Sequence, residues 1–184
     1  EDLYSDLGNV ELQGSAGLTP DSAFYFLEDA VESILVGDDP ETALEYKEEK
    51  ILELREMIES GDTDAALKAL ERVEKYSEIV EKEVSPDIEK RVRESSKAVK
   101  EVFQELEDDI AGEEWNEVRE DVEEHEKKED DLAKAAKVSS KIKELCEELS
   151  KLDPLEYARV CKTDDDAPKW QRELDDDLTE QQKE

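Results

Sequence analysis

Acidic side chains, two cysteines and one histidine are the residues of this chain whose types could carry chemistry. Three consecutive aspartates, Asp164, Asp165 and Asp166, could supply oxygen ligands to a hard cation. Asp164, Asp166 and Asp175 also have the spacing of positions 1, 3 and 12 of a twelve-residue calcium loop, but Pro168 stands at position 5, where an oxygen ligand is needed. That loop type is therefore excluded. A weaker site for calcium or another hard cation at the three aspartates is an alternative to a cluster that caps the following helix.

His125 is the only histidine in the sequence, which restricts the metal and catalytic sites that the chain could build. Carboxylate di-iron bundles need Glu-x-x-His on two helices, and the residue three positions before His125 is Val122. The sequence also has no glycine-rich phosphate loop and no G-x-S-x-G nucleophile elbow. We therefore expect no enzymatic activity and no resident cofactor. His125 is expected to be a polar residue of a helical seam, satisfied by neighbouring carboxylates.

The two cysteines, Cys146 and Cys161, lie on either side of the turn signal Asp153-Pro154. Their spacing favours a disulfide that pins a short C-terminal helical hairpin, and such a bond implies an oxidising, extracytoplasmic setting. Two separate buried thiols in a cytosolic protein are the alternative. Zinc is not expected at the cysteines, because two further ligands at a suitable spacing are missing.

The charge balance narrows the classes of partner. The 184 residues include 57 Asp and Glu against 25 Lys and Arg, a formal net charge of -32, which repels nucleic acid and anionic membranes. Because the acids are spread along the chain, a solvated, salt-adapted surface is favoured over a cation-binding surface or a disordered acidic tail. No stretch approaches the roughly 20 apolar residues of a membrane helix, so we expect no insertion into a membrane. The first residue, Glu1, is compatible with a removed signal peptide or with a trimmed chain.

Residues 40–83 are predicted to form two antiparallel helices joined at Gly61-Asp62. Asp39 can cap the first helix, with Pro40 at its first position. Gly61 suits the left-handed position that ends a helix, and Asp62 can cap the next helix at once. Apolar residues recur every seven positions on both helices: Leu44, Ile51 and Ile58 on the first, and Ala66, Val73 and Val80 on the second.

Residues 1–17 are acidic and punctuated by Gly and Ser, and are predicted to form a flexible leader. A first helix should then begin at Thr19-Pro20 and stop at Gly37. It carries three consecutive aromatic residues, Phe24, Tyr25 and Phe26. These aromatic residues are interpreted as packing against the 40–83 hairpin, with an exposed docking surface as the alternative.

Two motifs in this half resemble a known family. Leu-Thr-Pro-Asp-Ser-x-Phe-Tyr at residues 18–25 and Gly-Asp-x-x-x-Ala-Leu-x-x-Leu at residues 61–70 are similar to motifs of small secreted helical domains of unknown function from archaea and bacteria. The resemblance covers about residues 17–84. It implies an exported, extracytoplasmic protein and supplies no catalytic residues. This sequence is more acidic than the usual family pattern.

The second half should contain another long helical hairpin. Ser85-Pro86 starts a helix that ends near Ala111-Gly112, and a further helix runs from Trp115 to Ser150. The apolar phase shifts within that second helix, from one row to two others: Val118, His125 and Leu132, then Ala135, Ile142 and Leu149 with Val138, Leu145 and Leu152. Because residues 123–131 are almost wholly charged, we expect either a bent middle or a solvent-exposed central turn. Short helices should follow Asp153-Pro154 and Pro168.

The sequence therefore predicts an all-α, elongated antiparallel bundle of about five main helices with a disulfide-pinned C-terminal cap. The expected organisation is a leader (1–17), a three-helix unit (18–84) and a second hairpin with its cap (85–184). Periodicity leaves open whether the helix after Pro86 packs on the first hairpin or extends from it. It also leaves open whether the polar seam is completed within one chain or by a second copy.

The leading functional hypothesis is a non-enzymatic, extracytoplasmic structural or protein-interaction domain with an acidic solvated surface. Its partner would be an unknown protein or another copy of the chain. The alternatives are an acidic protein that binds hard cations and the ectodomain of a membrane-anchored sensor or regulator.

Overall fold

The computed structural model describes residues 3–8, 10, 12, 37, 39–162 and 167–181. Over these residues the chain is helical and contains no strand, which confirms the all-α class. The α-helices are α2 (Pro40–Ser60), α3 (Thr63–Lys82), α4 (Glu89–Leu106), α5 (Asn116–Leu152), α6 (Pro154–Val160) and α7 (Lys169–Gln181). Two 3-10 turns, η1 (Pro86–Ile88) and η2 (Glu113–Trp115), precede α4 and α5. The predicted first helix lies outside the described residues.

The α2–α3 hairpin forms as its capping residues predict. The side chain of Asp39 accepts a hydrogen bond from the backbone N–H of Thr42 at 2.8 Å. Gly61 ends α2 in the left-handed region with φ of 79°, and Asp62 accepts from the N–H of Ala65 at 2.9 Å. The end of α2 and the start of α3 leave backbone groups without intrahelical partners, and this tight connection provides hydrogen bonds for them.

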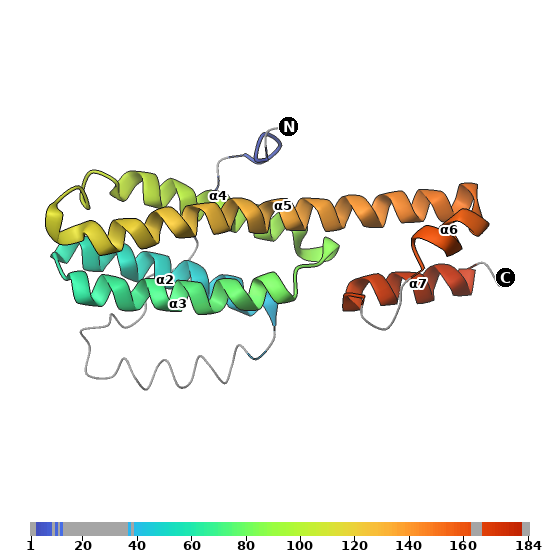
Figure 1. The fold of residues 1–184 in the computed structure, drawn as a ribbon, viewed down its shortest axis with the longest axis horizontal. Helices are drawn as coiled ribbons and strands as arrows, with labels where there is room; N and C mark the ends of the chain where they lie inside the picture. The colour runs from blue at the N-terminus through green and yellow to red at the C-terminus, as the bar shows by residue number, and fades with distance from the viewer. Residues whose placement is uncertain are drawn as a thin grey trace.

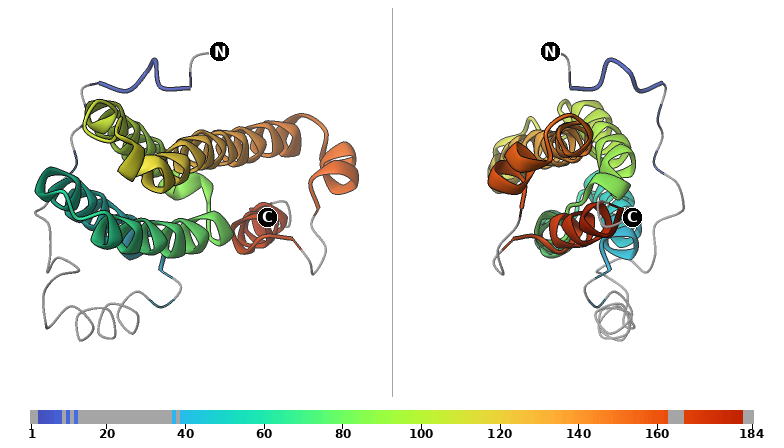
Figure 2. Two further views of the ribbon diagram at one scale, coloured as in Figure 1. Left: turned by 60° about the vertical axis from the view of Figure 1, so that its left-hand side comes forward. Right: turned by 90° about the vertical axis from the view of Figure 1, so that its right-hand side faces the viewer.

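The two hairpins, α2–α3 and α4–α5, pack as two layers around a shared core (Figures 1 and 2). Helix α4 contacts α2, and α5 contacts α3, so α4 packs on the first hairpin instead of extending from it. Aliphatic side chains from all four helices fill the core, together with one phenylalanine and one tryptophan. The members of this core include Ile51, Leu54, Leu70, Val73, Val99, Phe103, Trp115 and Val118. This four-helix body is the frame on which the rest of the chain is built.

A buried ion pair connects the two layers. Lys47 Nζ of α2 lies 2.8 Å from Glu129 Oε2 of α5, and the two side chains are 0% and 1% exposed. Ser96 of α4 donates a hydrogen bond to the same carboxylate oxygen at 2.7 Å. Three helices therefore meet at one carboxylate in the interior, where an unpaired charge would be strongly unfavourable.

Helix α5 is a single helix of 37 residues, which excludes the central turn and leaves the alternative of one long helix. The charged stretch 123–131 stays helical because its inward-facing members have partners: Glu129 pairs with Lys47, and His125 lies against Glu74 of α3. The C-terminal half of α5 extends past the ends of α2 and α3 towards α6 and α7 (Figure 1).

The boundaries of α4 differ from the expected ones. Pro86 begins the 3-10 turn η1 and the α-helix starts only at Glu89, because Ser85 makes no side-chain capping bond. The helix ends at Leu106, whose carbonyl accepts from both Asp109 and Ile110 in a tight turn. That turn buries Ile110 in the core.

Part of the segment predicted as a leader contacts the body. Tyr4 donates a hydrogen bond to Asp130 of α5 at 2.9 Å, and Arg93 of α4 donates to the carbonyl of Leu3 at 2.7 Å. Arg93 also pairs with Asp6 and, at 2.7 Å, with Glu89. Residues 3–6 therefore lie along α4 and α5.

Replacing Lys47 with Met should destabilise the protein severely, because it leaves the buried carboxylate of Glu129 without its counter-ion. The expected loss is about 3–5 kcal/mol in the free energy of unfolding. The matched control is Lys82→Met, which breaks an exposed pair with Glu78 at 3.5 Å and should cost less than about 1 kcal/mol. Urea unfolding followed by circular dichroism measures both, and equal losses in the two variants would contradict the role given to Lys47.

Candidate interaction surface

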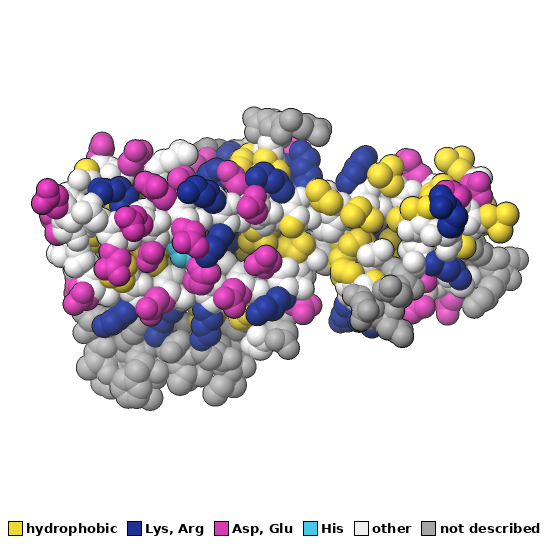
Figure 3. Space-filling view, viewed as in Figure 1, with side chains coloured by type: hydrophobic (Ala, Val, Ile, Leu, Met, Phe, Trp, Pro, Cys, Tyr) yellow, Lys and Arg dark blue, Asp and Glu magenta, His cyan; other side chains and the backbone are white. Residues whose placement is uncertain are grey.

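The large apolar side chains that are exposed among the described residues all lie on the C-terminal half of α5 and on α6. They are Val138 (56% exposed), Ile142 (40%), Leu145 (52%), Leu152 (83%), Leu155 (85%) and Val160 (58%). Figure 3 shows apolar side chains gathered where α5 leaves the four-helix body and over α6, whereas the body presents a mixed acidic and basic surface. We call this set of six residues the apolar face.

The apolar phase shift along α5 separates two sides of one helix. The inward side keeps a single phase along the whole helix. Its steps alternate between four and three residues up to Ser139, followed by one of seven and one of four, and its members are Val118, Val122, His125, Glu129, Leu132, Ala136, Ser139, Cys146 and Ser150. Val138, Ile142, Leu145 and Leu152 were expected to continue the packed seam. They lie on the other side of α5 and are exposed. The phase shift was the signal in the sequence that could have identified this second side.

The segment that borders the apolar face carries charge of the opposite sign to the rest of the chain. Residues 134–151 carry five lysines and three glutamates, in a protein whose net charge is -32. Three of these lysines are paired: Lys134 with Asp131 at 2.8 Å, Lys143 with Asp87 at 2.8 Å and Lys141 with Glu144 at 3.1 Å. The apolar face therefore has a mildly basic border and lies within an otherwise acidic protein.

A groove of about 610 Å³ runs beside the start of the apolar face. Arg93 and Glu89 of α4 line one wall, and Lys137, Val138 and Lys141 of α5 line the other. The guanidinium of Arg93 is already occupied by Glu89 and Asp6, so the wall on α4 is largely neutralised.

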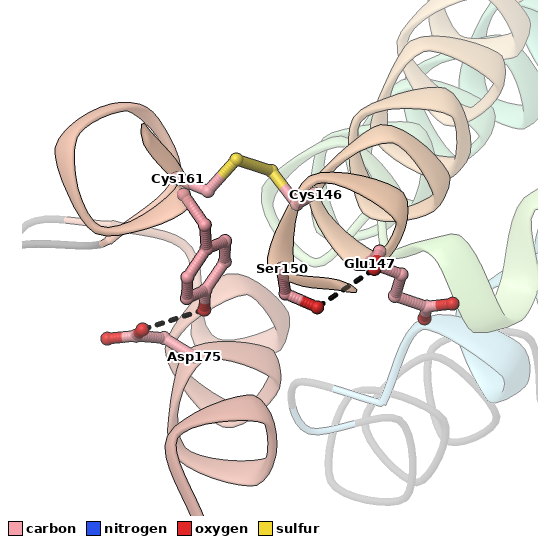
Figure 4. Close-up of a disulfide and its surroundings, with 6 residues drawn as sticks. Cys146, Glu147, Ser150, Cys161 and Asp175 are labelled. Atoms are coloured by element: carbon pink, nitrogen blue, oxygen red, sulfur yellow. Dashed lines mark hydrogen bonds between the residues drawn. A yellow bond between two sulfur atoms is a disulfide. The ribbon is translucent and has the colours of Figure 1, made fainter. Parts of the chain in front are cut away.

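The disulfide between Cys146 and Cys161 is confirmed, with Cα atoms 5.9 Å apart, and it ties α6 to α5 (Figure 4). Tyr157 of α6 is buried in one cluster with Cys146 and Cys161, and it donates a hydrogen bond to Asp175 of α7 at 2.8 Å. Burial and this hydrogen bond raise the pKa of Tyr157 above its usual value. The disulfide and a small apolar cluster with Leu178 thus hold the far end of α5 in place.

His125 lies in the interface between α3 and α5. Its Nε2 is 3.5 Å from Glu74 Oε2, and Lys128 pairs with the same carboxylate at 2.6 Å. Its Nδ1 is buried and has no hydrogen-bond partner in the part of the chain that the structure describes. Burial lowers the pKa of His125, although the nearby carboxylates of Glu74, Glu129 and Asp121 act in the opposite direction. The histidine is therefore held in its neutral form within the interface.

Two sets of predicted site residues lie outside the described residues. They are the candidate cation ligands Asp164, Asp165 and Asp166 and the aromatic cluster Phe24, Tyr25 and Phe26. Within the described ranges, no group of three or more His, Cys, Asp or Glu residues is placed to hold a metal ion. No helix in those ranges is long and apolar enough to cross a membrane.

Comparison with known proteins gives no match among family models, curated proteins or solved structures. The resemblance of residues 17–84 to small secreted helical domains stays a prediction. The function is accordingly argued from the geometry of this chain.

Replacing His125 with Gln should remove a dependence of stability on pH. Because the folded-state pKa of His125 is below the usual 6.5, the unfolded chain binds a proton that the folded chain does not when the pH falls below about 6.5. The wild type should therefore lose stability on acidification through this window, by at most about 1.4 kcal/mol per pH unit, and His125→Gln should lose less.

The measurement is urea unfolding of both proteins between about pH 8 and pH 5.5, above the range in which most carboxylates titrate. The carboxylates are common to both proteins, so only the difference in unfolding free energy matters. A difference that stays constant across the range would show that His125 does not titrate on unfolding as described.

Proposed function

We propose that this chain is a non-enzymatic, extracytoplasmic interaction domain that binds protein through the apolar face. The observation that carries the proposal is the set of exposed aliphatic residues on α5 and α6. Five of them are more than half exposed: Val138, Leu145, Leu152, Leu155 and Val160.

Exposed aliphatic side chains in contiguous patches are unfavourable in a monomer. Burying apolar surface contributes about 25 cal/mol per Å², and patches of this kind on soluble proteins mark interaction sites. The heavy negative charge of the rest of the chain keeps the protein soluble while the patch is open. The acidic surface thus offsets the low solubility that an exposed apolar face would otherwise cause.

The apolar face is built on a rigid element. The N-terminal half of α5 is packed in the four-helix body, and its C-terminal end is tied to α6 by the disulfide. A partner that docks on a preorganised helix loses little conformational entropy in the protein, and more of the burial energy appears as affinity. The placement of the patch between two fixed ends supports a docking function.

The extracytoplasmic setting is supported by the Cys146–Cys161 disulfide, because such bonds persist mainly in oxidising compartments. The resemblance of residues 17–84 to exported helical domains points the same way. The non-enzymatic character is supported by the sequence, which offers a single histidine and no nucleophile or phosphate-binding motif.

Calcium binding is the competing function that the charge suggests, and calorimetry separates the two. We expect titration of calcium into the dialysed, oxidised protein to give only weak heats without a saturable isotherm, since a net charge of -32 attracts counter-ions diffusely. A saturable isotherm at micromolar calcium with a raised melting temperature would favour cation binding instead. Asp164→Asn with Asp166→Asn would then be the variant to examine.

A photo-activatable amino acid at Leu145 tests the proposed docking directly. In the native host, illumination should give one discrete covalent adduct through position 145, because this side chain is 52% exposed at the centre of the apolar face. The matched control places the same amino acid at Glu117, an exposed position at the start of α5. Adducts at both positions, or at neither, would contradict docking on the apolar face.

A further inference from the structure

We propose that the partner is a second copy of this chain, which pairs antiparallel along residues 135–152 of α5. This inference rests on the proposed function and names its partner. The contact is made by an outer stripe on α5, which consists of Ala135, Val138, Ile142, Leu145, Leu149 and Leu152.

The outer stripe has the spacing of a two-helix seam. Its steps alternate between three and four residues, as in a heptad repeat in which two apolar rows face a partner helix. In one antiparallel register, Ile142 lies level with Leu145 of the second copy. The same register sets Val138 level with Leu149, and Ala135 level with Leu152. Every layer is then apolar on both sides, and the stripe is complementary to itself.

The stripe is free to receive another helix. On the inward side of this part of α5, Ser139, Cys146 and Ser150 are buried. The stripe lies on the other side, where Val138 and Leu145 are more than half exposed. Residues 135–152 span about 27 Å at the rise of an α-helix. Leu149 is partly buried against the cluster of Cys146, Tyr157, Cys161 and Leu178, so the second helix would lie beside this cluster.

The charged residues that border the stripe favour the antiparallel orientation. Lys141 and Glu148 are exposed and occupy equivalent positions one heptad apart, on the same side of the stripe. In the antiparallel register, Lys141 of each copy faces Glu148 of the other, and the two-fold symmetry makes this pair twice. A parallel pairing would place each lysine level with its own counterpart. The excess of lysine over glutamate in residues 134–151 also reduces repulsion where two acidic chains meet.

The self-complementary stripe explains why a second copy is favoured over an unrelated protein. A two-fold interface uses the same patch on both subunits and closes without leaving a free surface. A seam of this length is small compared with permanent interfaces, so the dimer should be weak. The charge of -32 on each copy opposes association at low ionic strength, and salt should strengthen it.

Sedimentation equilibrium of the intact, oxidised protein tests the pairing. In about 1 M salt, where the Debye length is about 3 Å, we expect a monomer–dimer equilibrium with a dissociation constant in the micromolar range. Leu145→Glu should weaken it at least about tenfold, because the change puts two charges into the central layers. The matched control is Ala111→Glu, which adds the same charge to an exposed position between α4 and η2, outside the apolar face, and should leave the equilibrium unchanged.

A charge exchange tests the register. At about 0.15 M salt, where the Debye length is about 8 Å and exposed charges are only partly screened, Lys141→Glu should weaken the dimer by up to about tenfold, because it places acids opposite acids at two symmetric positions. Adding Glu148→Lys should restore the wild-type dissociation constant by reversing both pairs. Both residues are exposed, so these variants should keep the helical circular dichroism spectrum and the unfolding midpoint even if Leu145→Glu does not fold.

The outcomes are distinguishable. A wild type that stays monomeric at all concentrations and salt levels overturns self-pairing, and an adduct of Leu145 with a different protein would still support the proposed docking function. The absence of both dimer and adduct overturns both proposals. Equal weakening by Ala111→Glu and Leu145→Glu, or failure of Glu148→Lys to rescue Lys141→Glu, overturns the antiparallel register.

Discussion

The contact between Lys47 and Glu129 is the interaction on which the rest of the structure depends. Both side chains are removed from water, so each needs the other, and Ser96 supplies a further hydrogen bond to the carboxylate. Because the pair joins α2 to α5, it fixes the rotation of α5 about its own axis. With Glu129 inward, Leu132 and Ala136 also face the core. The outer stripe then has no place in the body and faces solvent.

The remaining features follow from a helix that is longer than the body that packs against it. The N-terminal half of α5 belongs to the four-helix core, and its C-terminal half reaches α6 and α7. An unsupported helix end would fray, but the disulfide and the buried Tyr157 anchor it. The result is a rigid apolar face with a lysine-rich border on an otherwise acidic protein. Such a face favours association with a partner, and the heavy charge limits nonspecific aggregation.

Local signals in the sequence predicted local structure well. Asp39, Pro40, Gly61 and Asp62 each act through their own backbone or their nearest turn, so the α2–α3 hairpin could be predicted without knowing its neighbours. The disulfide also followed from a spacing across one turn. Predictions failed where the decision depended on distant contacts. The charged middle of α5 stays helical because Lys47 and Glu74 lie against it, and neither contact is visible in the local sequence.

The sequence alone determined that α5 carries two apolar rows in different phases, because periodicity is a property of one helix. It could not determine which row would be buried. The outer row is the more apolar of the two, whereas the inner row includes His125, Glu129 and Ser139, so the choice between them is made by what packs alongside. The tertiary structure decided it: Lys47 binds Glu129 in the inner row, and the outer stripe with Leu145 at its centre stays open. The candidate interaction surface therefore depends on contacts between residues more than 80 positions apart.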